Sequence, residues 1–348
     1  MTPNIATILP PLLRALTVLE FIARHLDPMT FDQMFAAVGT PDDALREALS
    51  GIDGEDDPAT TSARLALSAF EGMRTALTNG DDLYAIYGAL RFLPRALEAL
   101  YSLASRDPVV NSFYLDPSLR GDADLVAHAA QPPRDGETGV MHVDNERGSR
   151  GGYSLYVPES YSSEQPLPLV MALHGGSGHG RAFLWSWLRD ARSLDAIVVA
   201  PTATGRTWAL MGDDTDTPNL HRILDDVSAR WQIDPTRLLL TGMSDGGTFC
   251  YVSGLEAGSR FTHLAPVSAT FHPMMTTMAD PARLNGLPIR ITHGARDWMF
   301  PAEVARRAAE SLAAAGGDVS YGEIDDLSHC YPREINAALL TWLRERPR

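Results

Sequence analysis

The segment TGMSDGG at residues 241–247 decides the fold of this chain, because it lies between an apolar run and a stretch that is compatible with a helix. The apolar run at residues 238–240 predicts a buried strand, and a helix is expected from Thr248 onward. A Gly-x-Ser-x-Gly turn between a strand and a helix reverses the chain so sharply that the serine side chain projects from the end of the sheet. Ser244 is therefore a candidate nucleophile, and the backbone N–H of Asp245 is a candidate donor to an oxyanion.

A second glycine-rich turn follows a predicted strand upstream. Residues 169–173 have the continuous apolar pattern of a buried strand and lead into HGGSG at residues 174–178. Glycines in this turn let the backbone approach a substrate closely, so the N–H of Gly176 is the second candidate oxyanion donor. His174 precedes the serine turn rather than facing it, which favours a structural hydrogen-bonding role.

A carboxylate and a histidine follow two later strands. Asp297 comes after a strand predicted at residues 289–292, and His329 comes after the last predicted strand. A serine hydroxyl attacks a carbonyl when a neutral imidazole accepts its proton, and a carboxylate on the other ring nitrogen holds the imidazole in the required tautomer. The aspartates at 325 and 326 are alternatives for the acid, but Asp297 is favoured because it alone follows a separate strand.

The chain order serine, aspartate, histidine, with each residue after a predicted strand, is that of the α/β-hydrolases. On these motifs, residues 153–343 resemble the α/β-hydrolase superfamily of serine esterases, closest to the polyhydroxybutyrate-depolymerase, feruloyl-esterase and phospholipase/carboxylesterase branch. The resemblance implies a catalytic triad and two backbone oxyanion donors, with no cofactor and no metal. The triad residues would be Ser244, Asp297 and His329, and the oxyanion donors would be Gly176 and Asp245.

The resemblance implies a carboxylic-ester hydrolase that works through an acyl-enzyme intermediate on a small-molecule or oligomeric ester. The alternatives are a peptidase, amidase or thioesterase on the same triad, or a non-catalytic hydrolase fold used for binding. The sequence contains no large β-propeller of the kind found in oligopeptidases, which disfavours the peptidase. The presence of all three triad residue types disfavours the non-catalytic protein.

Three residues are candidates for the substrate pocket. Trp298 adjoins Asp297, Trp208 follows the strand predicted at residues 196–200, and His272 follows a strand on the catalytic side. The alternative for the two tryptophans is packing in the core.

Composition excludes several classes of function. The 348 residues carry a net charge of −15 and no lysine, so the basic residues are all arginines. An acidic chain of this kind is not expected to bind nucleic acid, and without lysine it forms neither a lysine Schiff base nor a lysine-bearing phosphate loop. Cys250 and Cys330 are predicted to be free thiols in a reducing compartment, with a single bridge as the alternative.

The N-terminus lacks the basic region of a secretory signal, and its apolar run is interrupted by Arg14 and Glu20. We therefore expect a cytoplasmic protein without a membrane span.

The periodicity predicts an N-terminal helical domain, residues 1–105, a proline-bearing linker, residues 106–136, and an α/β catalytic domain, residues 137–348. The catalytic domain should contain a mostly parallel sheet with helices on both faces. Its expected strands are at 139–143, 153–157, 169–173, 196–200, 238–241, 263–267, 289–292 and 319–324. We expect the helical domain to cap the active site and shape the acyl pocket, and the alternatives are homo-oligomerisation or stabilisation of the catalytic domain.

Overall fold

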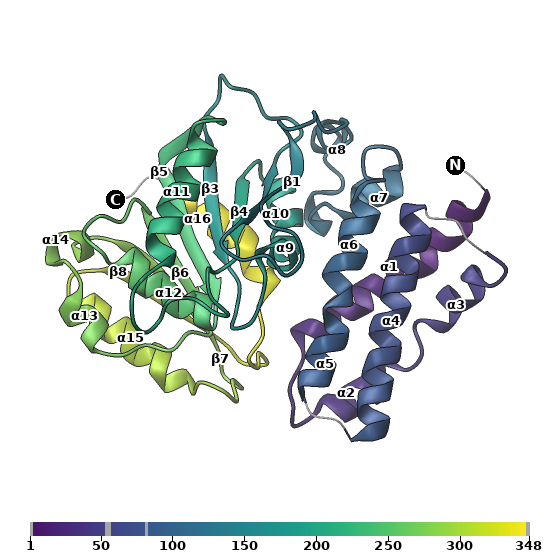
Figure 1. Cartoon of the computed structure of the whole chain (residues 1–348), viewed down its shortest axis with the longest axis horizontal. Helices are drawn as coiled ribbons and strands as arrows, with labels where there is room; N and C mark the ends of the chain where they lie inside the picture. The colour runs from purple at the N-terminus through teal and green to yellow at the C-terminus, as the bar shows by residue number, and fades with distance from the viewer. Residues whose placement is uncertain (1–2, 53–56, 81–82, 346–348) are drawn as a thin grey trace. The chain divides into compact units, whose positions relative to one another are not determined.

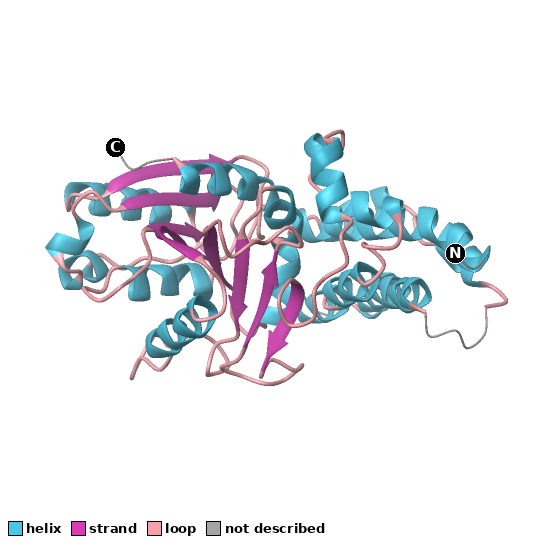
Figure 2. Cartoon of the chain, turned by 90° about the horizontal axis from the view of Figure 1, so that it is seen from above, coloured by secondary structure: helices cyan, strands magenta, loops and turns pink. Residues whose placement is uncertain are grey.

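The chain forms two compact units, Met1–Pro132 and Pro133–Arg348, in a computed structural model that describes residues 3–52, 57–80 and 83–345. Within the described residues, strands occur only in the second unit, whereas the first is built from helices and loops (Figure 2). The predicted fold class, an α/β sheet domain preceded by a helical region, is therefore confirmed.

The helices of the first unit pack around a seam of apolar residues. On α1 the buried side chains recur at helical spacing, from Ile8 through Leu12 and Leu16 to Leu19, and α1 contacts α3, α4 and α6. Among the long helices, α4 begins with Pro58 at its first turn, and the Asp57 carboxylate caps it. The helices are α1 (Pro3–Arg24), α2 (Phe31–Val38), α3 (Asp43–Leu49), α4 (Pro58–Asn79), α5 (Leu83–Leu90), α6 (Phe92–Tyr101), α7 (Pro108–Phe113), the 3₁₀ turn η1 (Pro117–Leu119) and α8 (Ala123–Ala129).

Helix α1 is longer and more apolar than the sequence pattern indicates. Residues 5–24 meet the length and hydropathy of a membrane-crossing helix even though Arg14 and Glu20 lie within them. A buried core helix can have the same length and composition. In the structure the apolar seam of α1 is buried in the first unit.

The stretch 106–136, for which the sequence predicts a linker, contains helical turns and lies mostly in the first unit. Two of its four prolines begin helical elements, whereas Pro132 and Pro133 lie in irregular chain where the two units divide. Asp107 caps α7 directly before Pro108, and Asp116 caps η1 directly before Pro117. Proline is well accommodated at the first helical position, where its missing N–H has no partner to lose.

The second unit contains an eight-stranded sheet in the order β1-β2-β4-β3-β5-β6-β7-β8. The β1–β2 and β2–β4 pairs are antiparallel, and the remaining pairs are parallel. The carboxyl ends of β3, β5, β6, β7 and β8 thus lie at one edge, where an open α/β sheet holds its ligands. The strands are β1 (Gly139–Val143), β2 (Tyr153–Val157), β3 (Leu167–Leu173), β4 (Ile197–Pro201), β5 (Ile233–Met243), β6 (His263–Val267), β7 (Pro288–Gly294) and β8 (Asp318–Ile324).

Helices lie on both faces of this sheet, with α11 and α12 in front and α16 behind in the view of Figure 1. Every residue of β2, β3, β4 and β6 is buried, as expected of strands covered on two sides. The helical elements are α9 (Gly180–Phe183), η2 (Leu184–Ser186), α10 (Leu188–Ser193), α11 (Asp216–Ser228), α12 (Asp245–Gly254), α13 (Met274–Met278), α14 (Pro281–Leu284), α15 (Ala302–Ala314), η3 (Arg333–Ile335) and α16 (Asn336–Arg344).

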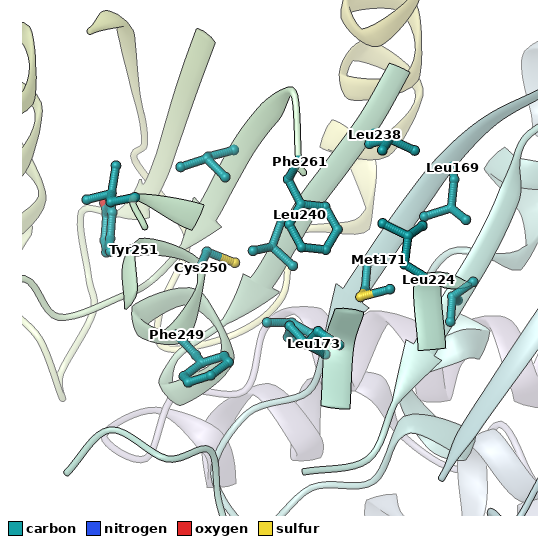
Figure 3. Close-up of a cluster of buried hydrophobic side chains, with 14 of the residues drawn as sticks. Leu169, Met171, Leu173, Leu224, Leu238, Leu240, Phe249, Cys250, Tyr251 and Phe261 are labelled. Atoms are coloured by element: carbon teal, nitrogen blue, oxygen red, sulfur yellow. The ribbon is translucent and has the colours of Figure 1, made fainter. Parts of the chain in front are cut away.

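The core under α11 and α12 is formed by alternate residues of neighbouring strands. Met171 and Leu173 of β3 and Leu240 of β5 point to the same side and meet Leu224 of α11 and Phe249 of α12 (Figure 3). This packing fixes the end of β5 and the start of α12, and therefore the turn between them.

Candidate active site

Ser244 occupies a sharp turn between β5 and α12. Its backbone has φ 56° and ψ −120°, a conformation that L-residues rarely adopt. The Ser244 N–H donates to the carbonyl of Val267 at 2.9 Å, which ties the turn to the end of β6. The turn therefore holds the serine at the carboxyl edge of the sheet, as the sequence predicts for a nucleophile elbow.

Gly246 makes this turn sterically possible. A Cβ atom at this position would lie 2.5 Å from the carbonyl oxygen of His174 and 2.6 Å from that of Leu173. Both obstacles are backbone atoms of the neighbouring turn after β3, so they cannot move aside without displacing that turn.

We expect Gly246→Ala to destabilise the second unit by about 1–3 kcal/mol, as overpacking does. Ester hydrolysis should fall at least about 100-fold, because small displacements of reacting groups are costly. Denaturant unfolding measures the loss of stability, and initial rates of ester hydrolysis measure the loss of activity. Gly258→Ala is the matched control, since a Cβ there meets no atom within 4 Å. Equal behaviour of the two variants would contradict the steric account.

The structure brings Ser244, His329 and Asp297 together as a hydrogen-bonded chain. His329 Nε2 lies 3.0 Å from Ser244 Oγ, and His329 Nδ1 lies 2.9 Å from Asp297 Oδ2 and 3.1 Å from Oδ1. All three residues are buried, and they follow β5, β7 and β8. Because a carboxylate only accepts, Nδ1 carries the proton and Nε2 accepts from the serine hydroxyl. This arrangement can take the proton of Ser244 during attack on a carbonyl.

Asp297 is held by backbone N–H groups of its own loop. Its Oδ1 accepts from Met299 N at 2.9 Å and from Phe300 N at 2.8 Å. Burial alone would raise the pKa of Asp297, but the hydrogen bond and charge of His329 and the Phe300 N–H outweigh burial and lower that pKa. The Asp297 carboxylate is therefore ionised at the pH values at which His329 is neutral enough to accept a proton. The alternative acids, Asp325 and Asp326, are exposed.

The turn after β3 lies directly against the serine. A Cβ on Gly175 would lie 3.7 Å from Ser244 Cβ, and one on Gly176 would lie 2.7 Å from Asp245 Oδ2. Asp245 begins α12, so its N–H has no acceptor within the helix. The two predicted oxyanion donors, Gly176 and Asp245, thus belong to adjoining backbone segments beside Ser244.

His174 shapes this turn as a neutral hydrogen-bonding residue. Its Nε2 accepts from the Ala203 N–H at 3.1 Å, so its Nδ1 carries the proton and donates to the Gly175 carbonyl at 2.7 Å. Burial lowers the pKa of His174 from 6.5 to about 4, although the bond to Gly175 opposes the shift. The structural role predicted for His174 agrees with these contacts.

This lowered pKa predicts that the second unit loses stability in mild acid. The unfolded chain binds a proton at His174 once the pH falls below 6.5, whereas the folded chain does so only near 4. Between pH 7.5 and 5.0 the free energy of unfolding should therefore fall by about 2 kcal/mol from this group. All six tryptophans lie in the second unit, so denaturant unfolding followed by tryptophan fluorescence measures the effect. A free energy that stays constant over this range would contradict the prediction.

Two residues that the sequence analysis missed hold the backbone segments around Gly176 and Asp245. Thr207 Oγ1 donates to Asp245 Oδ2 at 2.5 Å. Arg150 donates to the carbonyls of Gly178 at 2.8 Å and Gly205 at 2.6 Å, and also to the carbonyl of Arg206. No local pattern signals these roles, because the partners are distant in the chain and most are backbone carbonyls.

The three predicted pocket residues have different environments. Trp208 is 2 % exposed, stacks on Phe249 and donates its Nε1–H to the His174 carbonyl at 2.7 Å. Its assignment to the substrate pocket is therefore wrong, because it packs in the core beneath the turn. Trp298 is 41 % exposed, and its ring centroid lies 6.1 Å from that of His329. His272 is exposed and accepts from the Met274 N–H at the start of α13.

Neither cysteine of the described chain forms a disulfide, and both thiols are buried. Cys250 lies on α12, where burial raises its pKa well above the ordinary value. Among the described residues, no group of three or more His, Cys, Asp or Glu side chains has the arrangement of a metal site.

Comparison with known proteins also points to esterases. Residues 213–345, which include Ser244, Asp297 and His329, match the phospholipase/carboxylesterase family. A probable feruloyl esterase C of Aspergillus oryzae (strain ATCC 42149 / RIB 40) is 25 % identical over 184 residues, which cover 51 % of this chain and 64 % of the relative. A bifunctional acetylxylan esterase/xylanase of Neocallimastix patriciarum is 28 % identical over 140 residues, covering 37 % of this chain and 19 % of that protein. This chain thus spans less than two thirds of the length of these relatives.

A solved structure shares the fold. The truncated form of a carbohydrate esterase from gut microbiota matches with a TM-score of 0.50 and 12 % identity, over 61 % of this chain and 98 % of that chain. The strand order, the serine turn between β5 and α12 and the chain order of the three residues agree with this likeness. The second unit therefore has the α/β-hydrolase fold and resembles the phospholipase/carboxylesterase family of esterases.

Proposed function

We propose that the protein is a serine hydrolase that cleaves carboxylic esters through an acyl-enzyme intermediate. The observation that carries the proposal is the hydrogen-bonded chain from Ser244 Oγ through His329 to Asp297, with N–O distances of 3.0 and 2.9 Å. The feruloyl and acetylxylan esterases among its relatives support an ester as the substrate.

In the first half-reaction Ser244 Oγ attacks the ester carbonyl carbon while His329 Nε2 accepts the hydroxyl proton. The carbonyl oxygen becomes an oxyanion, and the N–H groups of Gly176 and Asp245 donate to it. Asp297 stabilises the imidazolium that forms at His329. The intermediate collapses when the bond to the alcohol oxygen breaks and His329 returns the proton to that oxygen, which leaves the acyl group on Ser244.

In the second half-reaction a water molecule replaces the alcohol. His329 Nε2 accepts a proton from water as its oxygen attacks the acyl carbon, and the same oxyanion donors serve again. Collapse breaks the bond to Ser244 Oγ, which recovers its proton from His329, and the carboxylic acid leaves.

Trp298 is proposed to contact the substrate. It is partly exposed to solvent, and its ring lies beside that of His329. Its neighbour Met299 is 43 % exposed, so the loop after β7 presents apolar surface next to the reacting groups.

A panel of p-nitrophenyl esters of increasing acyl length, assayed beside a p-nitroanilide and a thioester, tests the proposal. We expect turnover of at least one oxygen ester, with the anilide cleaved far more slowly. Preference for the anilide would indicate an amidase or peptidase, preference for the thioester would indicate a thioesterase, and turnover of none of these substrates would contradict the proposal.

A further inference from the structure

A second buried histidine lies against the carboxylate that supports His329. His293 is fully buried near the end of β7, and its Nε2 lies 3.3 Å from Asp297 Oδ2. The same Nε2 donates to the carbonyl of Phe300 at 2.8 Å. Because a carbonyl only accepts, Nε2 must carry a proton.

The other ring nitrogen of His293 has no use within the fold. Its Nδ1 is buried and has no hydrogen-bond partner among the described residues. An unpaired buried polar atom is costly, so an apolar side chain would fill this position at lower cost if packing alone mattered. The reason for a histidine at this position therefore lies in the contacts of its Nε2 with Phe300 and Asp297.

That nitrogen acts on the loop that contains Asp297. Met299 N and Phe300 N hold Asp297 Oδ1, while the Nε2–H of His293 holds the Phe300 carbonyl and places a positive dipole beside Oδ2. Oδ2 is the oxygen nearest His329 Nδ1. The carboxylate is thus fixed from both sides, with Oδ2 facing the imidazole.

We infer that His293 is a positioning residue that orients Asp297 toward His329 and moderates the charge of that carboxylate. This inference rests on the proposed function, because the effect is read through ester hydrolysis. His293 touches no substrate and acts only through Asp297. Glu323, its cross-strand neighbour on β8, is a second carboxylate near it and is paired with Arg306 and Tyr321.

The test uses two amide side chains of different reach. In His293→Gln the amide nitrogen takes the place of Nε2 and can still donate toward Phe300 and Asp297. In His293→Asn the amide nitrogen takes the place of Nδ1 and cannot. His293→Leu removes both nitrogens. For the Asn and Leu variants we expect kcat/KM for p-nitrophenyl acetate to fall about 10- to 100-fold, with most of the loss in kcat. Losses of this size follow when a residue that orients a functional group through a hydrogen bond is replaced.

The pH–rate profile separates positioning from a structural role. Without the Nε2–H the Asp297 carboxylate is less neutralised and favours the imidazolium more, so the acid limb of kcat/KM should move to higher pH by up to about one unit. His293→Gln should restore most of the rate and the position of that limb. His263→Gln replaces another buried histidine, at the start of β6, and controls for lost stability, since it should leave the acid limb in place.

Equal rates and acid limbs for the Asn and Gln variants would overturn the inference, and this comparison decides the matter even if the Leu variant does not fold. Wild-type protein that hydrolyses no ester would instead contradict the proposed function. The two failures are therefore distinguishable.

Discussion

Replacing Ser244 with alanine is expected to lower kcat/KM for p-nitrophenyl esters by about 10⁶-fold, as when a catalytic serine is removed from a comparable triad. The hydroxyl is the only group of this residue within hydrogen-bond distance of His329 Nε2, at 3.0 Å, and alanine leaves nothing to attack the carbonyl. Residual hydrolysis would come from water and the oxyanion donors alone.

The fold should tolerate this change, because alanine and serine both carry a Cβ and are equally strained by the φ of 56° at this position. Far-ultraviolet circular dichroism and the denaturation midpoint check the fold. Ser253→Ala is the matched control on α12, the helix that follows Ser244, since its buried hydroxyl has no partner among the described residues. We expect that control to keep wild-type rates. If Ser244→Ala also kept them, Ser244 would not be the nucleophile.

Replacing Asp297 with asparagine is expected to lower kcat about 10⁴-fold while the fold persists. An amide nitrogen can donate to His329 Nδ1, which would place the ring proton on Nε2 and leave no acceptor for the serine hydroxyl. The amide also cannot stabilise the imidazolium that forms during attack. The pKa of Asp297 is held low by His329 and by the Phe300 N–H despite burial, so the wild-type carboxylate stays ionised throughout the assay range.

Asp325→Asn is the control for this prediction, because Asp325 follows β8 close to His329 in the chain but is exposed. Its rate should stay within about twofold of wild type, as for a screened surface charge. If Asp325→Asn and Asp297→Asn lost activity equally, Asp297 would not be the acid.

The strands and the serine turn could be predicted because their signals are local. The strands at 139–143, 153–157 and 263–267 have the predicted bounds, since turn residues flank each apolar run. The strand predicted at 238–241 instead begins at Ile233, which pairs with Leu167. That pairing comes from the partner strand and leaves no pattern in residues 233–237.

The meeting of Ser244, Asp297 and His329 could be predicted because each follows a strand, and parallel strands bring their carboxyl ends to one edge. The environment of Trp208 could not, because it depends on a stack against Phe249 and a hydrogen bond to His174, which are 41 and 34 residues away in the chain. The contact of His293 with Asp297 spans only four residues but depends on how the loop after β7 folds back.

Reaction with a fluorophosphonate, followed by intact mass and peptide mapping, tests most directly whether Ser244 is the nucleophile. We expect one covalent adduct per chain, located on Ser244, absent from Ser244→Ala and slowed in Asp297→Asn. An adduct on another residue, or loss of ester hydrolysis at a dose that leaves Ser244 unmodified, would show that Ser244 is not the nucleophile.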